Sequence, residues 1–372
     1  DYTGGGCPHI LAEPQRTNLF PYSEDFSDVT WDKQLVTITS SIVTSPSGTT
    51  NATEILETAV NGNHGMYYTL NSALGGTDYS ISMFVKKLNR RYFGLQSWYS
   101  STWGAIAFFD LDTGTLIYEF AEGTDYSVNN SKIEDYGNGW YKISTIFQIP
   151  SSSAFYAGFV LADTEWTTGT SYDNPYTGDT TKGVYIWGAQ LEEGSYATSY
   201  IPTSGSTVTR NQDIFTRDGI GSLINSTEGV LFVEMAALSD DLTYRMISLS
   251  DGTVDNSINI QYSGVSNTIR TRVENSSVAQ ADITYTILNP KSFSKIAVLY
   301  KLNKFELWFN GSKVGEDTSG TPPLGLSKLA FDRGDSGSPF YGKVKQLQVY
   351  DTSLSDNQLI QLTGEAGTHF FE

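Results

Sequence analysis

The sequence predicts an all-β protein built from two antiparallel β-sandwich domains in tandem. Apolar residues recur at every second position in many short runs, which is the period of a strand with one buried face. Glycine-rich and polar turn signals separate these runs, and the long Leu, Ala, Glu and Lys stretches typical of helices are scarce. A chain of 372 residues exceeds one ordinary domain, so two domains are the natural expectation.

Two runs in the first half illustrate the strand pattern. In YSISMFVKK, beginning at Tyr79, residues Tyr79, Ile81, Met83 and Val85 alternate with Ser80, Ser82, Phe84 and Lys86. The run YKISTIFQI, beginning at Tyr141, repeats the pattern. Asp112-Thr113-Gly114 and Gly137-Asn138-Gly139 supply turns between such runs, so we expect short antiparallel strands.

The second half repeats this organisation from about Glu228 onward. In KFELWFNG, residues Phe305, Leu307 and Phe309 share one face, and Asn310-Gly311 is a typical hairpin turn. The sequence SDNQLIQL predicts a short helix near the end, with Ser355 as N-cap and Gln358 completing a capping box.

Turn-rich segments set the expected domain boundaries. Residues 1–22 look like an irregular lead-in, because three glycines and three prolines are spread through them. We expect the first domain at 23–205, a connector at 206–213 and the second domain at 214–372. Tyr196, Tyr200 and Pro202 belong to a polar stretch that we expect to leave the first sandwich and dock as a rigid connector, so that the two domains are held rigidly, and we expect Trp187 in the core.

Charge and rare residues exclude several classes of function. The net charge of −18 disfavours nucleic acid and anionic lipid as partners, since phosphate binding needs clustered Lys and Arg. No apolar stretch is long enough for membrane insertion. The single cysteine, Cys7, rules out an intrachain disulfide, and three histidines make a His-rich metal site or a Ser/His/Asp triad improbable.

Several motifs in the first half resemble a known module when taken together and in order. The stretches EPQRTNLFPYSEDFSDVTW, FDLDTGT, GNGWYKIS and YIWGAQLEEGSYATSYIPTSGSTVTRNQD resemble a jelly-roll module that recurs in phage tail and fibre proteins. This module is similar to carbohydrate-binding modules of the galactose-binding-like type. The resemblance extends over most of residues 10–213 and implies a jelly-roll sandwich.

The second half resembles a laminin G, concanavalin A-like lectin domain over residues 214–363. FELWFNGSKVG followed by FYGKVKQLQVYDTSLSDNQLIQL matches the family's terminal hairpin, strand and short helix. These motifs are structural, so they point to the fold more firmly than to a function.

The candidate binding residues are aromatic. Sugar rings stack their C–H faces on flat side chains, while nearby polar groups meet the hydroxyls. The candidates form two segments of the first domain: Trp98, Tyr99 and Trp103, then Asp163, Trp166, Tyr172, Asp173 and Tyr176. Gln96, Arg91 and Asn174 are further polar neighbours. A structural role in the core remains the alternative for each aromatic residue.

The resemblance to jelly-roll modules also implies a structural calcium ion that joins the first and last strands. Glu24, Asp25 and Glu192 lie at suitable ends of the chain to be its ligands. No cofactor is otherwise required.

Catalysis has weaker support in the sequence. A glycoside hydrolase needs two opposed carboxylates, and Asp110-Leu111-Asp112 ends in a tight turn instead. The Arg/Gln/His/Tyr strand set of alginate-lyase sandwiches is absent from the sequence. We therefore assign no catalytic residue, although similar sandwiches do include hydrolases and lyases.

These observations lead to an expectation of a non-catalytic glycan-binding protein. The resemblance implies a receptor-binding part of a phage tail or virion appendage, exposed on the virion and binding host surface glycan. Other virion proteins would be partners, and homo-oligomers are expected. A polysaccharide-degrading enzyme, or its binding appendage, secreted by a bacterium is one alternative. A structural virion decoration protein is the other.

Overall fold

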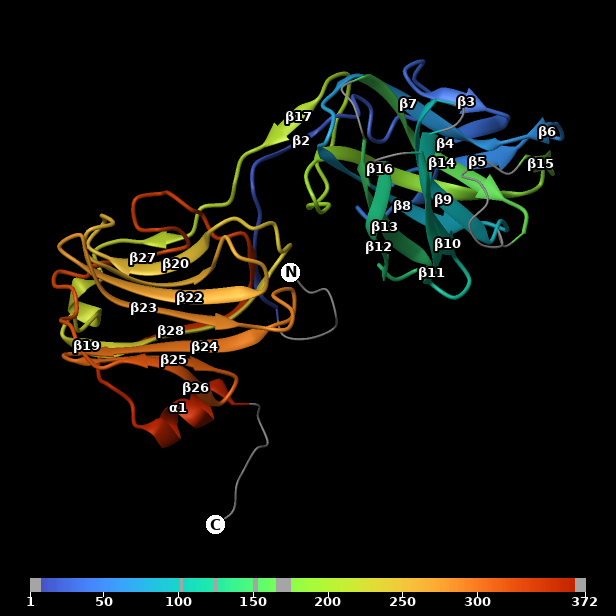
Figure 1. The fold of residues 1–372 in the computed structure, drawn as a ribbon. Coiled ribbons are helices and arrows are strands. Elements are labelled where there is room, and N and C mark those ends of the chain that lie inside the picture. The colour runs from blue at the N-terminus through green and yellow to red at the C-terminus, as the bar shows by residue number, and fades with distance from the viewer. Residues whose placement is uncertain (1–7, 101–102, 124–125, 150–152, 165–174, 365–372) are drawn as a thin grey trace, which may run out of the picture. The chain divides into compact units, whose positions relative to one another are not determined.

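Two blocks of strands form nearly all the regular structure in the computed structural model, which describes residues 8–100, 103–123, 126–149, 153–164 and 175–364. One unit comprises Gln15–Asn211, here called the first sandwich. The other comprises Asp1–Pro14 and Gln212–Glu372, here called the second sandwich. Each is a pair of packed antiparallel sheets (Figure 1), so the predicted all-β fold class is confirmed.

The first sandwich contains two six-stranded sheets and two short strand pairs. Its first sheet has the order β11 (Thr115–Glu122), β10 (Trp103–Asp110), β9 (Tyr92–Ser100), β14 (Ser153–Ala162), β7 (His64–Ala73), β3 (Asp32–Gln34). Its second sheet has the order β12 (Ser127–Asp135), β13 (Trp140–Gln148), β8 (Asp78–Lys87), β16 (Gly183–Glu193), β5 (Thr50–Glu57), β4 (Val36–Thr44). The short pairs are β15 (Tyr176–Thr177) with β6 (Asn61–Gly62), and β17 (Val208–Arg210) with β2 (Arg16–Asn18).

The second sandwich also consists of two six-stranded sheets. The first has the order β1 (Ile10–Ala12), β28 (Gly342–Tyr350), β19 (Glu228–Ala237), β24 (Ser294–Lys301), β25 (Lys304–Phe309), β26 (Ser312–Asp317). The second has the order β18 (Thr216–Arg217), β27 (Lys328–Ala330), β20 (Arg245–Ser250), β21 (Ser257–Tyr262), β22 (Thr268–Asn275), β23 (Val278–Thr286). A 3-10 turn at Gly221–Leu223 and the helix α1 (Asp356–Thr363) complete the described part.

Local sequence signals are confirmed where hairpin and helix were predicted. Asn310 and Gly311 join β25 to β26 with φ angles of 44° and 86°, both in the left-handed region that such a turn needs. Ser355 caps α1, and its side chain and that of Gln358 form the reciprocal capping box. No helix among the described residues is long and apolar enough to cross a membrane.

Strand β8 differs from the expectation of one buried face. Tyr79, Ile81, Met83 and Val85 do fill the core between the two sheets. Phe84, on the opposite face, is also buried, because Trp187 and Tyr200 pack against it with ring centroids 5.2 and 6.4 Å away. The outer face of this sheet is therefore covered as well.

The segment after β16 provides this cover by docking against the first sandwich, and the expectation that it holds the two domains rigidly stays a prediction. The Tyr200 hydroxyl hydrogen-bonds to Ser23 at 2.6 Å and to Glu24 at 3.0 Å. Ile201 donates its backbone N–H to the Gln190 side chain at 2.6 Å, and Thr203 bonds to Phe20 and Ser23. These contacts all lie within the first sandwich, so the segment is part of that unit rather than a free linker.

The N-terminal segment differs from the irregular lead-in that we expected. Strand β1 pairs with β28 in the second sandwich, with Ile10 opposite Val344 and Ala12 opposite Gly342. Strand β2 pairs with β17 in the first sandwich. Three-residue strands carry almost no periodicity of their own, and their partners lie far away in sequence. The pairing was therefore invisible in the local pattern.

Candidate functional site

An aromatic surface in the described residues begins on β9. Side chains alternate along this strand, so Phe93 and Leu95 enter the core, while Gln96 and Trp98 lie on the outer face of the sheet. Tyr99 belongs to the inner side, where it packs against the core cluster. The side chains of Trp98 and Tyr99, which are neighbours in sequence, therefore lie on opposite faces of the sheet.

Trp98 belongs to a group of three half-buried rings, here called the aromatic trio: Tyr67, Trp98 and Tyr156. Trp98 and Tyr156 are stacked, with centroids 5.2 Å apart and planes 21° from parallel. Tyr67 meets Trp98 edge-on at 4.9 Å and Tyr156 edge-on at 5.4 Å. Such edge-to-face and offset contacts are preferred by aromatic quadrupoles, so the trio is held in place by its own rings.

A glycine lies on β14, the strand between Tyr67 and Trp98. Tyr67 on β7 and Trp98 on β9 are separated by β14, and next-nearest strands lie roughly 9–10 Å apart. The residue of β14 that pairs with both Tyr67 and Gln96 is Gly158. A Cβ at position 158 would lie 1.9 Å from the backbone oxygen of Met66 and 2.6 Å from the Cα of Tyr67, so glycine allows β14 to lie this close to β7 beside the trio.

Polar groups lie beside these rings. Gln96 sits next to Gly158 in the same row of the sheet and is 8% exposed. Asp32 on β3 pairs with Tyr67 and is exposed. Burial raises the pKa of Tyr67, and the negative charge of Asp32 raises it further. The Tyr67 hydroxyl therefore stays protonated and can donate a hydrogen bond at neutral pH.

The side chains at the other end of this outer face are apolar and buried. Ile106, Phe108 and Val160 are buried there, and Tyr92 stacks against Phe108 with centroids 5.9 Å apart. The Arg91 guanidinium lies 5.0 Å from the centre of the Tyr92 ring. The exposed part of the face is thus the end that carries the trio.

Arg91 is itself fixed by carboxylates. It forms a two-pronged contact with Asp110, at 2.8 and 2.6 Å, and this contact holds the pKa of Asp110 well below its usual range. Asp112 lies 3.7 Å from the same guanidinium and also pairs with Lys87. Asp110 and Asp112 therefore stabilise the turn after β10, as the sequence suggested. They do not form the opposed pair of carboxylates that a glycoside hydrolase needs.

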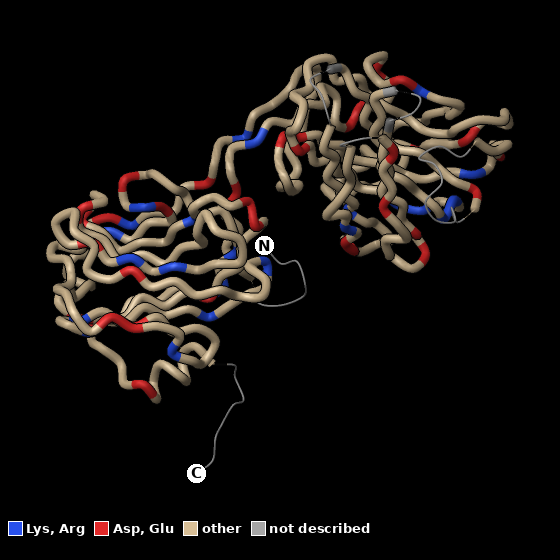
Figure 2. The backbone as a smooth tube through the Cα atoms, viewed as in Figure 1, with Lys and Arg blue, Asp and Glu red and all other residues tan. Residues whose placement is uncertain are grey.

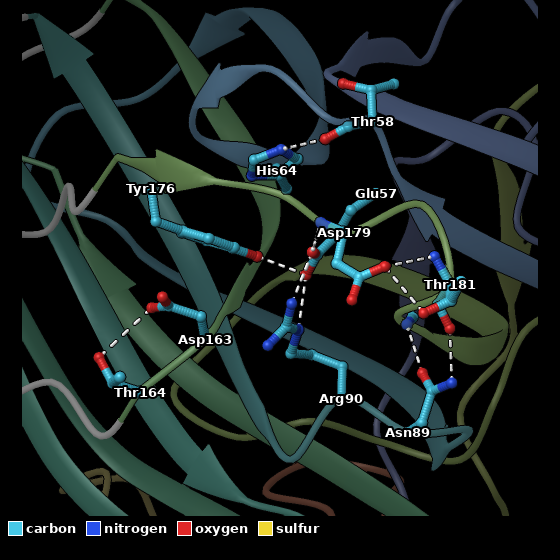
Figure 3. A network of polar contacts seen from close by, with 11 residues as sticks. Glu57, Thr58, His64, Asn89, Arg90, Asp163, Thr164, Tyr176, Asp179 and Thr181 are labelled. Atoms are coloured by element: carbon cyan, nitrogen blue, oxygen red, sulfur yellow. Dashed lines mark hydrogen bonds and ion pairs between the residues drawn. The ribbon is translucent and has the colours of Figure 1, made fainter.

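Tyr176 has a structural role in a buried polar network (Figure 3). The Glu57 carboxylate, 1% exposed, receives two hydrogen bonds of 2.6 Å from Arg90 and one from the Tyr176 hydroxyl. The backbone N–H of Asp179 adds a fourth at 2.9 Å. Arg90 also lies over the Tyr176 ring, 5.4 Å from its centre, and His64 packs on that ring at 4.6 Å.

This network occupies Tyr176 completely. Its ring is 8% exposed, so it offers no open face to a ligand. Burial raises the pKa of its hydroxyl, and the hydrogen bond to Glu57 raises it further. We conclude that Tyr176 stabilises the β5–β15 region and does not belong to the aromatic surface.

The remaining sequence candidates have different positions. Asp163 is exposed just after β14 and contacts Thr164 at 3.3 Å. Trp103 begins β10, where its backbone pairs with Ser100. Trp166, Tyr172 and Asp173 lie outside the described residues. The structure thus brings Trp98 into a surface group whose other members, Tyr67 and Tyr156, sequence reasoning missed.

The sequence contained only part of the information needed to find Tyr67 and Tyr156. Tyr67 and Tyr156 lie in alternating runs, GMYYTL and SAFYAGFV, that identify them as strand residues with one outward side. Alternation does not tell which strands become neighbours. The trio depends on the sheet order β9-β14-β7, which only the fold supplies.

The expected calcium ligands are not brought together. Glu24 accepts hydrogen bonds from Asn51 at 2.8 Å and from Tyr200 at 3.0 Å. Asp25 binds Ser27, and the buried Glu192 accepts two hydrogen bonds from Thr198. Within the described parts of the chain, no three His, Cys, Asp or Glu side chains are grouped closely enough to hold a metal ion. The structural calcium ion therefore stays a prediction.

Comparison with known proteins bears on the second sandwich. Residues 231–360 match the family model of the concanavalin A-like lectin/glucanases superfamily, of laminin G type. This confirms the predicted resemblance of the second half to laminin G and concanavalin A-like lectin domains over that range. No curated protein matches the chain.

Solved structures with similar folds are distant in sequence. The carbohydrate-binding module CBM40 of the Ruminococcus gnavus IT-sialidase is 16% identical, with a TM-score of 0.34. It covers 41% of this chain and 99% of its own. Domains LG4-5 of the mouse laminin alpha1 chain are 11% identical with a TM-score of 0.26, covering 78% of this chain and 88% of theirs. Sheep galectin-11 is 10% identical with a TM-score of 0.27, covering 37% and 97%.

Proposed function

We propose that this protein binds glycans and does not catalyse a reaction on them. Its first sandwich contacts the sugar through the aromatic trio of Tyr67, Trp98 and Tyr156. The observation that carries the proposal is the pre-assembled surface of three rings on one sheet face, with Gln96 and Asp32 beside it. Stacked rings fit the apolar face of a sugar, and the neighbouring amide, carboxylate and phenol groups suit its hydroxyls.

Affinity at one such site is expected to be weak. Each sugar hydroxyl exchanges a hydrogen bond with water for one with protein, at a net gain of only about 0.5–1.5 kcal/mol. Useful adhesion then requires several sites acting together, so we expect a homo-oligomer or an assembly with many copies.

The charge distribution narrows the class of glycan. The chain carries a net charge of −18, and basic positions are interspersed with acidic ones along the described backbone (Figure 2). Such a surface repels an anionic polymer at low salt. The target at the trio is therefore a neutral glycan, or one bridged by cations.

The biological setting follows from the sequence resemblance of the first half. We infer a receptor-binding part of a phage tail or virion appendage, located on the virion surface and binding host surface polysaccharide. A preparation of virions, probed with an antibody to this chain, tests that setting: labelling at a tail or fibre supports it. Detection only in a secreted bacterial fraction contradicts it.

The site itself is tested by a glycan array followed by affinity measurement on the best neutral ligand. Trp98→Ala and Tyr156→Ala are each expected to weaken binding at least tenfold, which is about 1.4 kcal/mol. The matched control is Tyr185→Ala, because Tyr185 is also a half-buried strand tyrosine but lies on β16 in the other sheet. Binding that survives both trio substitutions in folded protein, or that maps wholly to residues 214–363, would show that the assignment is wrong.

We also expect no depolymerisation of polysaccharides. A hydrolase needs paired catalytic carboxylates, whereas Glu57 and Asp110 are each held by an arginine. A lyase would need a readily ionised tyrosine, whereas the pKa values of Tyr67 and Tyr176 are raised. Incubation with a polysaccharide panel should release neither reducing ends nor unsaturated products. Release that disappears on substitution of one Tyr or acid would overturn this expectation.

A further inference from the structure

Strand β4 is an edge of the second sheet of the first sandwich, and its sequence VTITSSIVT contains no charged residue and no proline. An edge strand exposes backbone N–H and C=O groups to foreign strands, and proteins usually protect it by short length, charge or proline. The other edges of the four six-stranded sheets in the described part are protected in this way. Strands β1, β3 and β18 have three residues or fewer, and β11, β12, β23 and β26 each contain Asp or Glu. Strand β4 alone among these edges is long and uncharged.

The neighbouring strand β5 shows which backbone groups of β4 are open. The N–H of Glu57 donates to the carbonyl of Lys182 at 3.0 Å, so the backbone groups of Glu57 point away from β4. In an antiparallel pair, residues directly opposite each other point their groups either both inward or both outward. Val36 lies opposite Glu57, and Ile38 lies opposite Ile55, two residues further on. The N–H and C=O groups of Val36 and Ile38 therefore point outward, to the open side of the sheet.

The part of β4 with regular strand geometry is short. Val36 and Ile38 are half-buried against the core, whereas Thr37 and Thr39 are exposed on the outer face. Ser41, at φ 61°, belongs to an irregularity that interrupts the register with β5 after Thr39. The segment that can accept another strand is therefore residues 36–39.

We propose that this edge pairs with β4 of a second copy of the chain, antiparallel and about a two-fold axis at Thr37. In this register Val36 of each copy lies opposite Ile38 of the other, so their open groups form four main-chain hydrogen bonds. The two Thr37 side chains lie side by side, which is a favourable cross-strand pair. A second copy fits this edge because the chain carries a net charge of −18, and β4 lets two such chains meet without charged residues opposite each other.

The symmetry of this pairing has a consequence for binding. Antiparallel strands of one sheet are related by a two-fold axis perpendicular to the sheet, and such an axis does not exchange the two faces. The outer faces that carry the aromatic trio therefore point to the same side of the dimer. Two trios can then contact one glycan-coated surface. This consequence rests on the proposed function, whereas the strand pairing does not.

Thr37→Cys, in the full chain carrying Cys7→Ser, tests the register. The two Cα atoms at such a non-hydrogen-bonded pair lie about 4.5 Å apart, within the disulfide range of roughly 4.4–6.8 Å. Mild oxidation with copper phenanthroline should therefore give a covalent dimer. Thr286→Cys in the same background is the control and should stay monomeric, because Thr286 is an exposed threonine on the protected edge strand β23. No cross-linking through Thr37→Cys, or equal cross-linking of both variants, overturns the proposal.

Analytical ultracentrifugation of the full chain tests the pairing without a cross-link. The chain should show a concentration-dependent equilibrium between monomer and dimer. Thr37→Lys should raise the dimer dissociation constant at least tenfold, because it places two like charges directly opposite each other. Thr286→Lys makes the same change in net charge at an exposed threonine and should leave the constant unchanged. A chain that is monomeric at all concentrations, or a dimer that Thr37→Lys does not weaken, refutes the pairing.

A binding measurement separates this inference from the proposed function. With the best neutral ligand of the glycan array, Thr37→Lys should keep the affinity for the soluble ligand and lose retention on a surface coated with it. Unchanged retention of this monomeric variant contradicts the same-side arrangement of the trios. A chain that dimerises through β4 and binds no glycan supports the pairing and refutes the proposed function alone.

Discussion

Replacing Arg90 by leucine is expected to lower the free energy of unfolding of the first sandwich by about 3–5 kcal/mol. The loss comes from Glu57, which stays buried after its partner Arg90 is removed. Glu57 is 1% exposed and would keep its hydrogen bonds from Tyr176 and Asp179 but lose the cation that pairs with it, Arg90. A buried carboxylate without a countercharge is among the most costly defects a folded protein can contain.

Two further variants show whether the unpaired charge is the cause. The double variant Glu57→Leu with Arg90→Leu should recover part of the loss, since it removes both charges together. Lys87→Leu breaks an ion pair with Asp112 whose side chains are 36% and 40% exposed, and it should cost less than about 1 kcal/mol. Calorimetric unfolding of the full chain measures all three. An Arg90→Leu effect as small as that of Lys87→Leu would contradict the account.

Replacing Asn18 by leucine is expected to cost a similar amount, about 3–5 kcal/mol, because at least two buried backbone groups lose their partners at roughly 1–3 kcal/mol each. Asn18 is fully buried. Its amide donates to the carbonyls of Ala189 and Ile201 at 3.2 and 2.9 Å. Its carbonyl oxygen accepts from the N–H groups of Phe20 and Leu191, both at 3.1 Å.

Asn18 therefore connects the N-terminal segment, β16 and the docked segment after it. The variant should show a lower melting transition and faster protease cleavage between residues 195 and 205, where backbone contacts are lost. Asn61→Leu is the control, because Asn61 is exposed and makes one long hydrogen bond of 3.4 Å. That substitution should change stability by no more than about 0.5 kcal/mol. Equal stability of the two variants would show that the four hydrogen bonds of Asn18 are dispensable.

The same contacts explain why the stretch from Val184 to Gly205 is so aromatic. Trp187 is buried beneath Tyr200 and beside Phe84, on the outer side of the second sheet. Gly188, at φ 65°, makes the bulge after Trp187 that restores the alternation for Leu191 in the core. The aromatic residues thus hold the chain against its own sandwich and are not a ligand surface.

Features that depend on neighbours along the chain could be predicted from the sequence. The alternation in β8, the Asn310-Gly311 hairpin and the capping box of Ser355 each involve residues within a few positions, so local pattern and backbone preference suffice to predict them. The all-β class with two sandwich units follows from the repetition of these local signals. The sequence also identified Trp98 as a candidate binding residue, because it is a tryptophan in a predicted strand with polar residues nearby.

Contacts between residues on different strands could not be predicted in this way, because they depend on the order of the strands in each sheet. Tyr67, Trp98 and Tyr156 come from three strands that the sheet order β9-β14-β7 makes neighbours. Gln261 and Arg333 line one cleft of the second sandwich although they lie 72 positions apart in the sequence. Tyr176 is buried, and its hydroxyl donates a hydrogen bond to Glu57. Strand β1, near the N-terminus, pairs with β28, which begins at Gly342. Sheet order and long-range pairing result from burial summed over the whole fold, and no local window of sequence contains that information.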